Sequence, residues 1–89
     1  MQDDGSKGRF VIYEEDTKAG EMTFTWAGDT SFIIDHTEVD PEFGGKGYAA
    51  KLVEAGVEYA RKRQVKIIPL CPYAGAQFKR HEEYQDVKA

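Results

Sequence analysis

Three glycines stand close together in the middle of the chain, at Gly44, Gly45 and Gly47. Glycine lacks a side chain, so a run of this kind lets several backbone N–H groups converge on one anion. Residues 46–63 have the apolar spacing of an α-helix, and a helix N-terminus adds about half a positive charge at its start. The sequence therefore predicts an anion-binding loop here, with a pyrophosphate as its natural ligand.

Two known phosphate-binding motifs can be compared with this loop. The segment from Gly45 to Ala50 fits the dinucleotide fingerprint G-x-G-x-x-A, but that motif requires an acidic residue about 20 positions further on. Residues 65–70 hold only a lysine and apolar residues at that distance, and the chain has room for a single βαβ unit. A nicotinamide or flavin cofactor is therefore disfavoured. The sequence G-x-x-x-x-G-K-S/T does not occur, which excludes a Walker-type nucleotide loop.

Four side chains outside the loop are candidates for proton or group transfer. His36 and Glu38 stand two positions apart in a strand-like stretch, so they share one face, and histidine changes its charge near neutral pH. Cys71 lies between an apolar run and a predicted helix, whose N-terminus lowers a thiol pKa. Tyr73 follows two residues later. Each also has a structural interpretation: a polar pair on a sheet, a small buried hydrophobe and a packed aromatic ring.

The elements that must position these residues follow from the spacing of the apolar side chains. Strict alternation predicts strands, and apolar residues three and four apart predict helices. The predicted elements are strands over 9–15, 21–26 and 31–39, a helix over 46–63, a strand over 65–70 and a helix over 73–83, with turns at 16–20 and 27–29. This β-β-β-α-β-α order predicts an α+β fold, with an antiparallel N-terminal meander and one parallel βαβ unit.

The predicted core comes from the strand over 21–26 and from one stripe of the long helix. Met22, Phe24 and Trp26 alternate with threonines and are expected to face inward. The helical stripe consists of Ala49, Leu52, Val53, Gly56, Val57 and Ala60. Residues 8–89 are predicted to form one domain, preceded by a polar and flexible N-terminus over residues 1–7.

Composition limits the classes of function. Twelve basic and sixteen acidic residues give a formal net charge of −4, which argues against a nucleic-acid binder and suits a cationic partner. Cys71 is the single cysteine, so no internal disulfide can form. The sequence opens with no secretory leader and contains no apolar run of about 18 residues. We expect a cytoplasmic protein that does not enter the membrane.

The loop and its flanks resemble the acetyl-CoA loop of the Gcn5-related N-acetyltransferases. That family carries the signature Gln/Arg-x-x-Gly-x-Gly/Ala after a strand and a V-x-P-x-F/Y lead-in. The lead-in corresponds to residues 39–43, and Gly47 and Ala49 match the last two signature positions. Gly44 departs from the signature at its first position, where a side chain would reach toward phosphate. Residues 34–39 and 66–73 are similar to a subgroup of short acetyltransferase-like proteins.

The resemblance implies a site for acetyl-CoA and no metal. Pantetheine would bond to the backbone near Glu38 and Val39, between the third and fourth strands. The acetyl group would then lie within reach of His36 and Cys71, and Tyr73 would orient it or protonate the departing thiolate. The pyrophosphate would rest on the backbone amides of Gly44, Gly45, Lys46, Gly47, Tyr48 and Ala49. Without an arginine or glutamine at position 44 we expect weaker CoA affinity.

The predicted activity is acetyl-CoA-dependent N-acetyl transfer to an amine acceptor. The acceptor amine attacks directly, with His36 or Glu38 as base, or the transfer passes through an acetyl-Cys71 intermediate; direct attack is preferred. One alternative is a CoA- or acyl-CoA-binding module with little or no catalysis, and a second is a pure protein-interaction domain. The acceptor, a small molecule or a protein, is not identified by the sequence. We expect a monomer or a weak homodimer.

Overall fold

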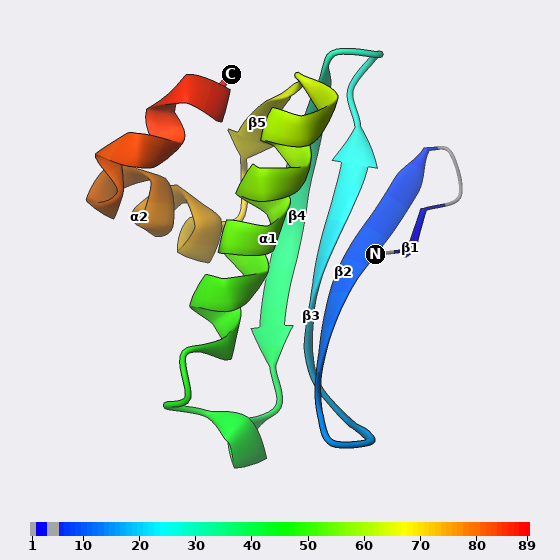
Figure 1. The fold of residues 1–89 in the computed structure, drawn as a ribbon, viewed down its shortest axis with the longest axis vertical. Coiled ribbons are helices and arrows are strands. Elements are labelled where there is room, and N and C mark those ends of the chain that lie inside the picture. The colour runs from blue at the N-terminus through cyan, green and yellow to red at the C-terminus, as the bar shows by residue number, and fades with distance from the viewer. Residues whose placement is uncertain (1, 4–5) are drawn as a thin grey trace.

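A mixed β-sheet with helices packed on one face forms the molecule (Figure 1). The computed structural model describes residues 2–3 and 6–89. The strands are β1 (Gln2–Asp3), β2 (Lys7–Glu14), β3 (Thr17–Trp26), β4 (Ser31–Val39) and β5 (Lys66–Pro69). The α-helices are α1 (Tyr48–Arg63) and α2 (Pro72–Arg80). Two short 3-10 helices are also present among these residues, η1 (Pro41–Phe43) and η2 (Glu82–Val87). The strands lie side by side in chain order, antiparallel up to β4 and parallel between β4 and β5. The predicted α+β fold with one parallel βαβ unit is confirmed.

The turn predicted over residues 16–20 is wrong. The chain turns at Glu15 and Asp16, and β3 already begins at Thr17. Gly20, which suggested a turn, is a strand residue paired with Val39. A Cβ atom at Gly20 would lie 2.6 Å from the carbonyl oxygen of Glu38, so this glycine permits a close approach of two strands.

The ends of the chain differ from the predicted pattern in two places. The helix predicted over 73–83 ends at Arg80, because His81 is extended and the chain continues as the 3-10 helix η2. At the N-terminus, Gln2–Asp3 pairs with β2, and Lys7 is its first residue. The rest of the predicted flexible segment includes residues 1, 4 and 5, which lie outside the described residues. Its flexibility stays a prediction.

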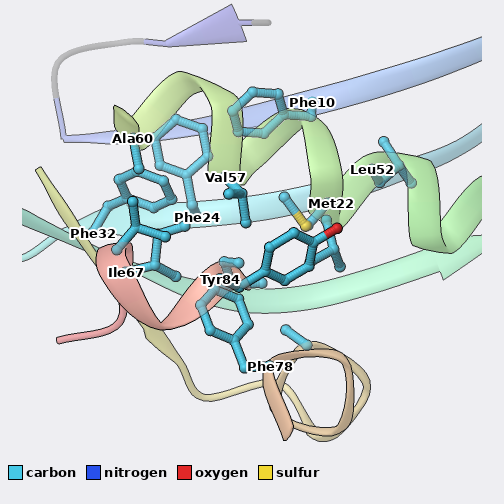
Figure 2. Close-up of a cluster of buried hydrophobic side chains, with 14 of the residues drawn as sticks. Phe10, Met22, Phe24, Phe32, Leu52, Val57, Ala60, Ile67, Phe78 and Tyr84 are labelled. Atoms are coloured by element: carbon cyan, nitrogen blue, oxygen red, sulfur yellow. The ribbon is translucent and has the colours of Figure 1, made fainter. Parts of the chain in front are cut away.

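A single hydrophobic core fills the space between the sheet and both α-helices. Figure 2 shows aromatic rings from the strands beneath α1, and Phe78 and Tyr84 closing the core from the C-terminal side. The largest fully buried side chains are Phe24, Phe32, Phe78, Met22, Ile34, Ile67, Val53 and Val57. The predicted inward-facing residues Met22 and Phe24 are fully buried, and Trp26 packs against the cluster.

An irregularity in β4 determines which side chains face the core. Phe24 pairs with Ile34, but Thr23 pairs with His36, so that Asp35 is an extra residue in β4. A bulge of this kind reverses the alternation of side chains beyond it. We call the side of the sheet that carries α1 and α2 the helix face and the other side the open face. Thr37, opposite the buried Met22, lies on the helix face.

The open face carries the polar side chains of the second half of β4. Asp35, His36 and Glu38 are all exposed, and the Thr25 hydroxyl donates a hydrogen bond of 2.7 Å to Asp35 Oδ2. Without the bulge, Ile34 and His36 would share a face, because alternate residues of a strand point the same way. The bulge thus moves His36 to the open face and Thr37 to the helix face.

Candidate functional site

The start of α1 leaves its first backbone N–H groups without a side-chain cap. Gly47 occupies the N-cap position with φ 77°, and no side chain of the described residues caps this end. The first turn also contains no acidic residue. Uncapped N–H groups at a helix start form a site for an anion. The predicted anion-binding loop therefore lies at the N-terminus of α1, two residues after the predicted start of the helix.

The glycines leave space in front of this helix start. Gly45 and Gly47 have φ values of 83° and 77°, in the left-handed region that other residues rarely adopt. A Cβ atom at either position would meet no heavy atom within 4 Å. The backbone is thus open to an incoming group, and its conformation requires glycine. Both observations fit the pyrophosphate of CoA, which would be held by the amides of this loop.

The segment before these glycines is anchored to the protein. The Asp40 carboxylate accepts a hydrogen bond of 3.0 Å from the Glu42 N–H and so caps η1, and the Phe43 ring is buried. Gly44 follows with φ −63° and ψ 147°, a conformation open to any residue. The departure from the family signature at Gly44 is therefore not imposed by the backbone.

Lys46 and Tyr48 both bind a carboxylate of the β2–β3 hairpin. The Lys46 ammonium lies 2.6 Å from Glu14 Oε1, and the Tyr48 hydroxyl donates to the same oxygen at 2.9 Å. The Lys46 hydrogen bond, together with that from Tyr48, lowers the pKa of Glu14, and the Glu14 bond raises the pKa of Lys46. Glu14 thus connects the hairpin to the loop, and Lys46 is already paired with a protein carboxylate. Nothing in the sequence indicated this contact.

Strands β4 and β5 stop pairing halfway along β4. Their register runs from Ser31 to Ile34 on β4, and the last bond is donated by the Cys71 N–H to the Ile34 carbonyl at 3.0 Å. Beyond this point the chain enters α2, while β4 continues to Val39. We call the region between residues 35–39 and Cys71 the fork. Glu38 and Val39, predicted to bond pantetheine, lie in this unpaired part of β4.

Cys71 is held at the fork by neutral hydrogen-bonding groups. Its side chain is buried, and Sγ lies 3.7 Å from Thr37 Oγ1. Burial raises the thiol pKa, but the backbone N–H groups of Ala74 and Tyr73 and both the hydroxyl and N–H of Thr37 lower it, and the net change is a lower pKa. This direction agrees with the predicted effect of the α2 N-terminus on the thiol, which stays a prediction.

The predicted catalytic residues are divided between the two faces of the sheet. His36 Nε2 lies 3.5 Å from Glu38 Oε2 on the open face, where both side chains are more than half exposed. Cys71 lies on the helix face beside Thr37, a residue that the sequence did not single out. Tyr73 is partly buried and packs against the core, as its structural interpretation predicted. The structure therefore brings together two pairs on opposite sides of β4.

A hollow with a volume of about 230 Å³ lies beside the end of β4. Glu38 borders it, together with Glu21, its pairing partner on β3, and with Asp40 beyond the end of β4. Lys18 is the basic residue among its lining side chains, and it is already hydrogen-bonded to Glu21. The hollow therefore offers a carboxylate-rich surface next to the His36–Glu38 pair.

The described part of the chain contains neither a metal-binding cluster nor a helix that could span a membrane. Across residues 2–3 and 6–89, no three His, Cys, Asp or Glu side chains come together as a group able to hold a metal ion. In the same residues, neither α-helix has the length and apolar character needed to cross a membrane.

An uncapped helix start beside a fork between parallel strands matches the arrangement that the resemblance implies for binding acetyl-CoA. The family model described as GCN5-related N-acetyl-transferase matches residues 9–87 of this chain. The protein therefore belongs to the GCN5-related N-acetyltransferase family, whose members use acetyl-CoA as cosubstrate.

Solved structures agree with this assignment. The solution structure of a GCN5-like protein from Staphylococcus aureus is 36% identical, with a TM-score of 0.74 over 91% of this chain and 80% of that one. Nourseothricin acetyltransferase is 27% identical, with a TM-score of 0.60 over 75% of this chain and 41% of that one. The ribosomal-protein-S18-alanine N-acetyltransferase from Escherichia coli, 17% identical, shares the fold with a TM-score of 0.72, over 89% of this chain and 54% of that one. No curated protein sequence matched the chain.

Proposed function

We propose that the protein transfers the acetyl group of acetyl-CoA to the amino group of a cationic acceptor. The observation that carries this proposal is the uncapped, glycine-lined start of α1 next to the fork between β4 and β5. The backbone of Glu38 and Val39 would bind pantetheine along the unpaired part of β4. The pyrophosphate would be bound by the loop residues Gly44, Gly45, Lys46, Gly47, Tyr48 and Ala49.

The two faces of the sheet correspond to two routes of transfer. A thioester in the fork lies at the level of the sheet, so groups on both faces can reach it. On the open face, His36, oriented by Glu38, would remove the proton from the attacking amine. On the helix face, the Cys71 thiolate would bond to the acetyl carbon while the bond from that carbon to the CoA sulfur breaks. The amine would then displace Cys71 from the acetyl group.

Exposure favours the direct route. The side chains of His36 and Glu38 are 63% and 69% exposed, so an acceptor can approach them without moving the protein. Cys71 is only 4% exposed, and an acetyl group bound to it would be hard for a second substrate to reach. Tyr73 stays a candidate for protonating the departing CoA thiolate, because it follows Cys71 by two residues.

The acceptor is expected to be a cation, such as a polyamine or a lysine side chain. The hollow beside β4 is bordered by Glu38 and Asp40 as well as by Glu21, which pairs with Lys18 and Arg9, so the first two carboxylates would attract an ammonium group. Its open position on the sheet places few steric limits on what is attached to the amine.

Turnover with a panel of amines tests the proposal. Release of free CoA would be followed with spermidine, short diamines and lysine-containing peptides as acceptors, and intact mass would show any acetyl group on Cys71. We expect His36→Ala to abolish turnover and His81→Ala to leave it unchanged, because His81 pairs with Glu83 away from β4. CoA binding without turnover on any amine would instead support the CoA-binding module, and a protein that binds no CoA would overturn both.

A further inference from the structure

Thr37 of β4 contacts the sulfur of Cys71 with its side chain. Its hydroxyl oxygen lies 3.7 Å from Sγ, and its backbone N–H also bonds to the cysteine. We propose that Thr37 is a positioning residue for Cys71: its hydroxyl and its N–H fix the sulfur at the fork and donate to it in the anionic form. The consequence for catalysis rests on the proposed function, whereas the effect on the thiol does not.

The bulge in β4 is what brings Thr37 to this position. Thr37 pairs with Met22, whose side chain is fully buried beneath α1, so both point to the helix face. Cys71 is fixed to the same strand by its N–H bond to Ile34. Sγ therefore lies between Thr37 on one side and the first turn of α2 on the other, where the N–H groups of Tyr73 and Ala74 reach it.

The backbone N–H groups and the Thr37 hydroxyl act differently on the thiol and the thiolate of Cys71. A backbone N–H can only donate, so it stabilises the thiolate more than the thiol. A hydroxyl can accept from the thiol and, after rotation, donate to the thiolate. Thr37 therefore keeps Sγ in one place while its charge changes. A valine would fill the same space and favour the strand, but it would lose the hydrogen bond.

Charged groups do not provide another explanation for the ionisation of Cys71. The charged and titratable side chains of β4 closest in sequence, Asp35, His36 and Glu38, lie on the open face. The first turn of α2 contributes only Tyr73 as a titratable side chain. The inward-facing residues of α1 are apolar, and Lys66 of β5 bonds to the Asp86 carbonyl at the other end of the strand. The groups that bond to Sγ are neutral.

The ionisation of Cys71 can be measured directly, because it is the only cysteine in the chain. The absorbance of the thiolate and the rate of alkylation by iodoacetamide would be followed against pH in the wild type and in three variants. Thr37→Val removes the hydroxyl, Thr37→Ser keeps it, and Thr25→Val is the matched control, because Thr25 bonds to Asp35 on the open face.

We expect Thr37→Val to raise the midpoint of both titrations and to slow alkylation at neutral pH about tenfold, the effect of one lost hydrogen bond to a charged group. Thr37→Ser and Thr25→Val should titrate like the wild type. An unchanged midpoint in Thr37→Val, or an equal shift in Thr37→Ser, would overturn the proposal. If Thr37→Val does not fold, Thr37→Ala provides the same comparison with a smaller side chain.

CoA binding by the same variants separates this inference from the proposed function. A wild type that does not bind CoA would contradict the proposed function, while the titration midpoints would still decide the role of Thr37. If the wild type does bind CoA, Thr37→Val should retain that affinity, because the hydroxyl bonds to Cys71, whereas CoA would be held by the backbone of Glu38 and Val39 and by the amides of the loop. Transfer through Cys71 would then show a lower kcat in Thr37→Val with an unchanged KM for acetyl-CoA.

Discussion

Replacing Gly47 by alanine tests whether the start of α1 is the CoA site. Gly47 has φ 77°, and Gly28, in the turn that precedes β4, has φ 78°. A Cβ atom would meet no heavy atom within 4 Å at either position. Gly28→Ala is therefore a matched control: it imposes the same backbone strain at the opposite end of β4, far from the loop (Figure 1).

The expected losses of stability and of CoA affinity follow from the backbone conformation of the two glycines. An alanine in the left-handed region costs about 1–2 kcal/mol relative to glycine. For a domain of this size that cost should lower the melting temperature of Gly28→Ala by roughly 4–16 °C. In Gly47→Ala the loop can relieve the strain by leaving the left-handed conformation, so that CoA must restore it on binding. The dissociation constant for CoA should then rise about 5- to 30-fold, and more if the added methyl group also contacts the phosphates.

The assay combines differential scanning calorimetry with isothermal titration of CoA into each variant. We expect the larger loss of melting temperature in Gly28→Ala and a loss of CoA affinity confined to Gly47→Ala. If Gly47→Ala bound CoA as tightly as the wild type does, the pyrophosphate could not rest on these amides. If Gly28→Ala lost as much affinity, the effect would come from general destabilisation, and the loop would have no special role.

Three further predictions concern single side chains. Glu14→Gln should lower the melting temperature at neutral pH. The difference from the wild type should shrink once the pH falls below about 4.5, the ordinary pKa of a glutamate, and disappear as the pH falls through the lowered pKa of Glu14 in the folded protein, because the carboxylate stabilises the fold only while it is ionised. Gly44→Arg should tighten CoA binding about fivefold in a calorimetric titration, the effect of about 1 kcal/mol from a new charge-assisted hydrogen bond. Tyr59→Phe should leave the melting temperature unchanged or raise it, because the buried Tyr59 hydroxyl has no hydrogen-bond partner among the described residues. The free energy of unfolding should rise by up to about 1 kcal/mol.

Each of these predictions has a matched control. Glu58→Gln removes a more exposed carboxylate that pairs with Arg61, and it should change stability less than Glu14→Gln does. Gly44→Ala adds a Cβ atom without a guanidinium and should not tighten CoA binding. Tyr48→Phe loses a hydroxyl that is bonded to Glu14, so it should destabilise the protein where Tyr59→Phe does not. A loss of stability in Tyr59→Phe would show that its hydroxyl finds a partner in solution.

The sequence predicted the elements whose side chains alternate or repeat clearly. β4 was predicted at its observed bounds, and the alternation of Met22 and Phe24 correctly gave the buried side of β3. Gly20 misled the prediction, because glycine serves both in turns and where two backbones approach closely, and one sequence does not tell which. The 3-10 helix η2 has no periodic signal of its own, so the helix over 73–83 was extended into it.

Of the candidate site, the loop was predicted from the sequence, whereas the fork was predicted only in part. Glycine spacing and the helix start are local signals, and they indicated the loop without reference to the rest of the fold. The division of His36 and Cys71 between two faces depends on the extra residue Asp35, and that in turn depends on how β3 and β4 pair. Thr37 and Glu14 were missed for the same reason, because their partners lie more than thirty positions away in the chain.

The bulge at Asp35 also determines which side chain of β4 faces Cys71 and which faces the acceptor. If β4 paired with β3 without this bulge, His36 would lie on the helix face and Thr37 on the open face. The thiol would then meet an imidazole, and the acceptor side would present a hydroxyl. Deleting Asp35 itself would keep the present arrangement, because His36 would then follow Ile34 directly and the strand would alternate regularly. The chemistry of the two faces therefore depends on how β4 pairs with β3, and not only on which residues β4 contains.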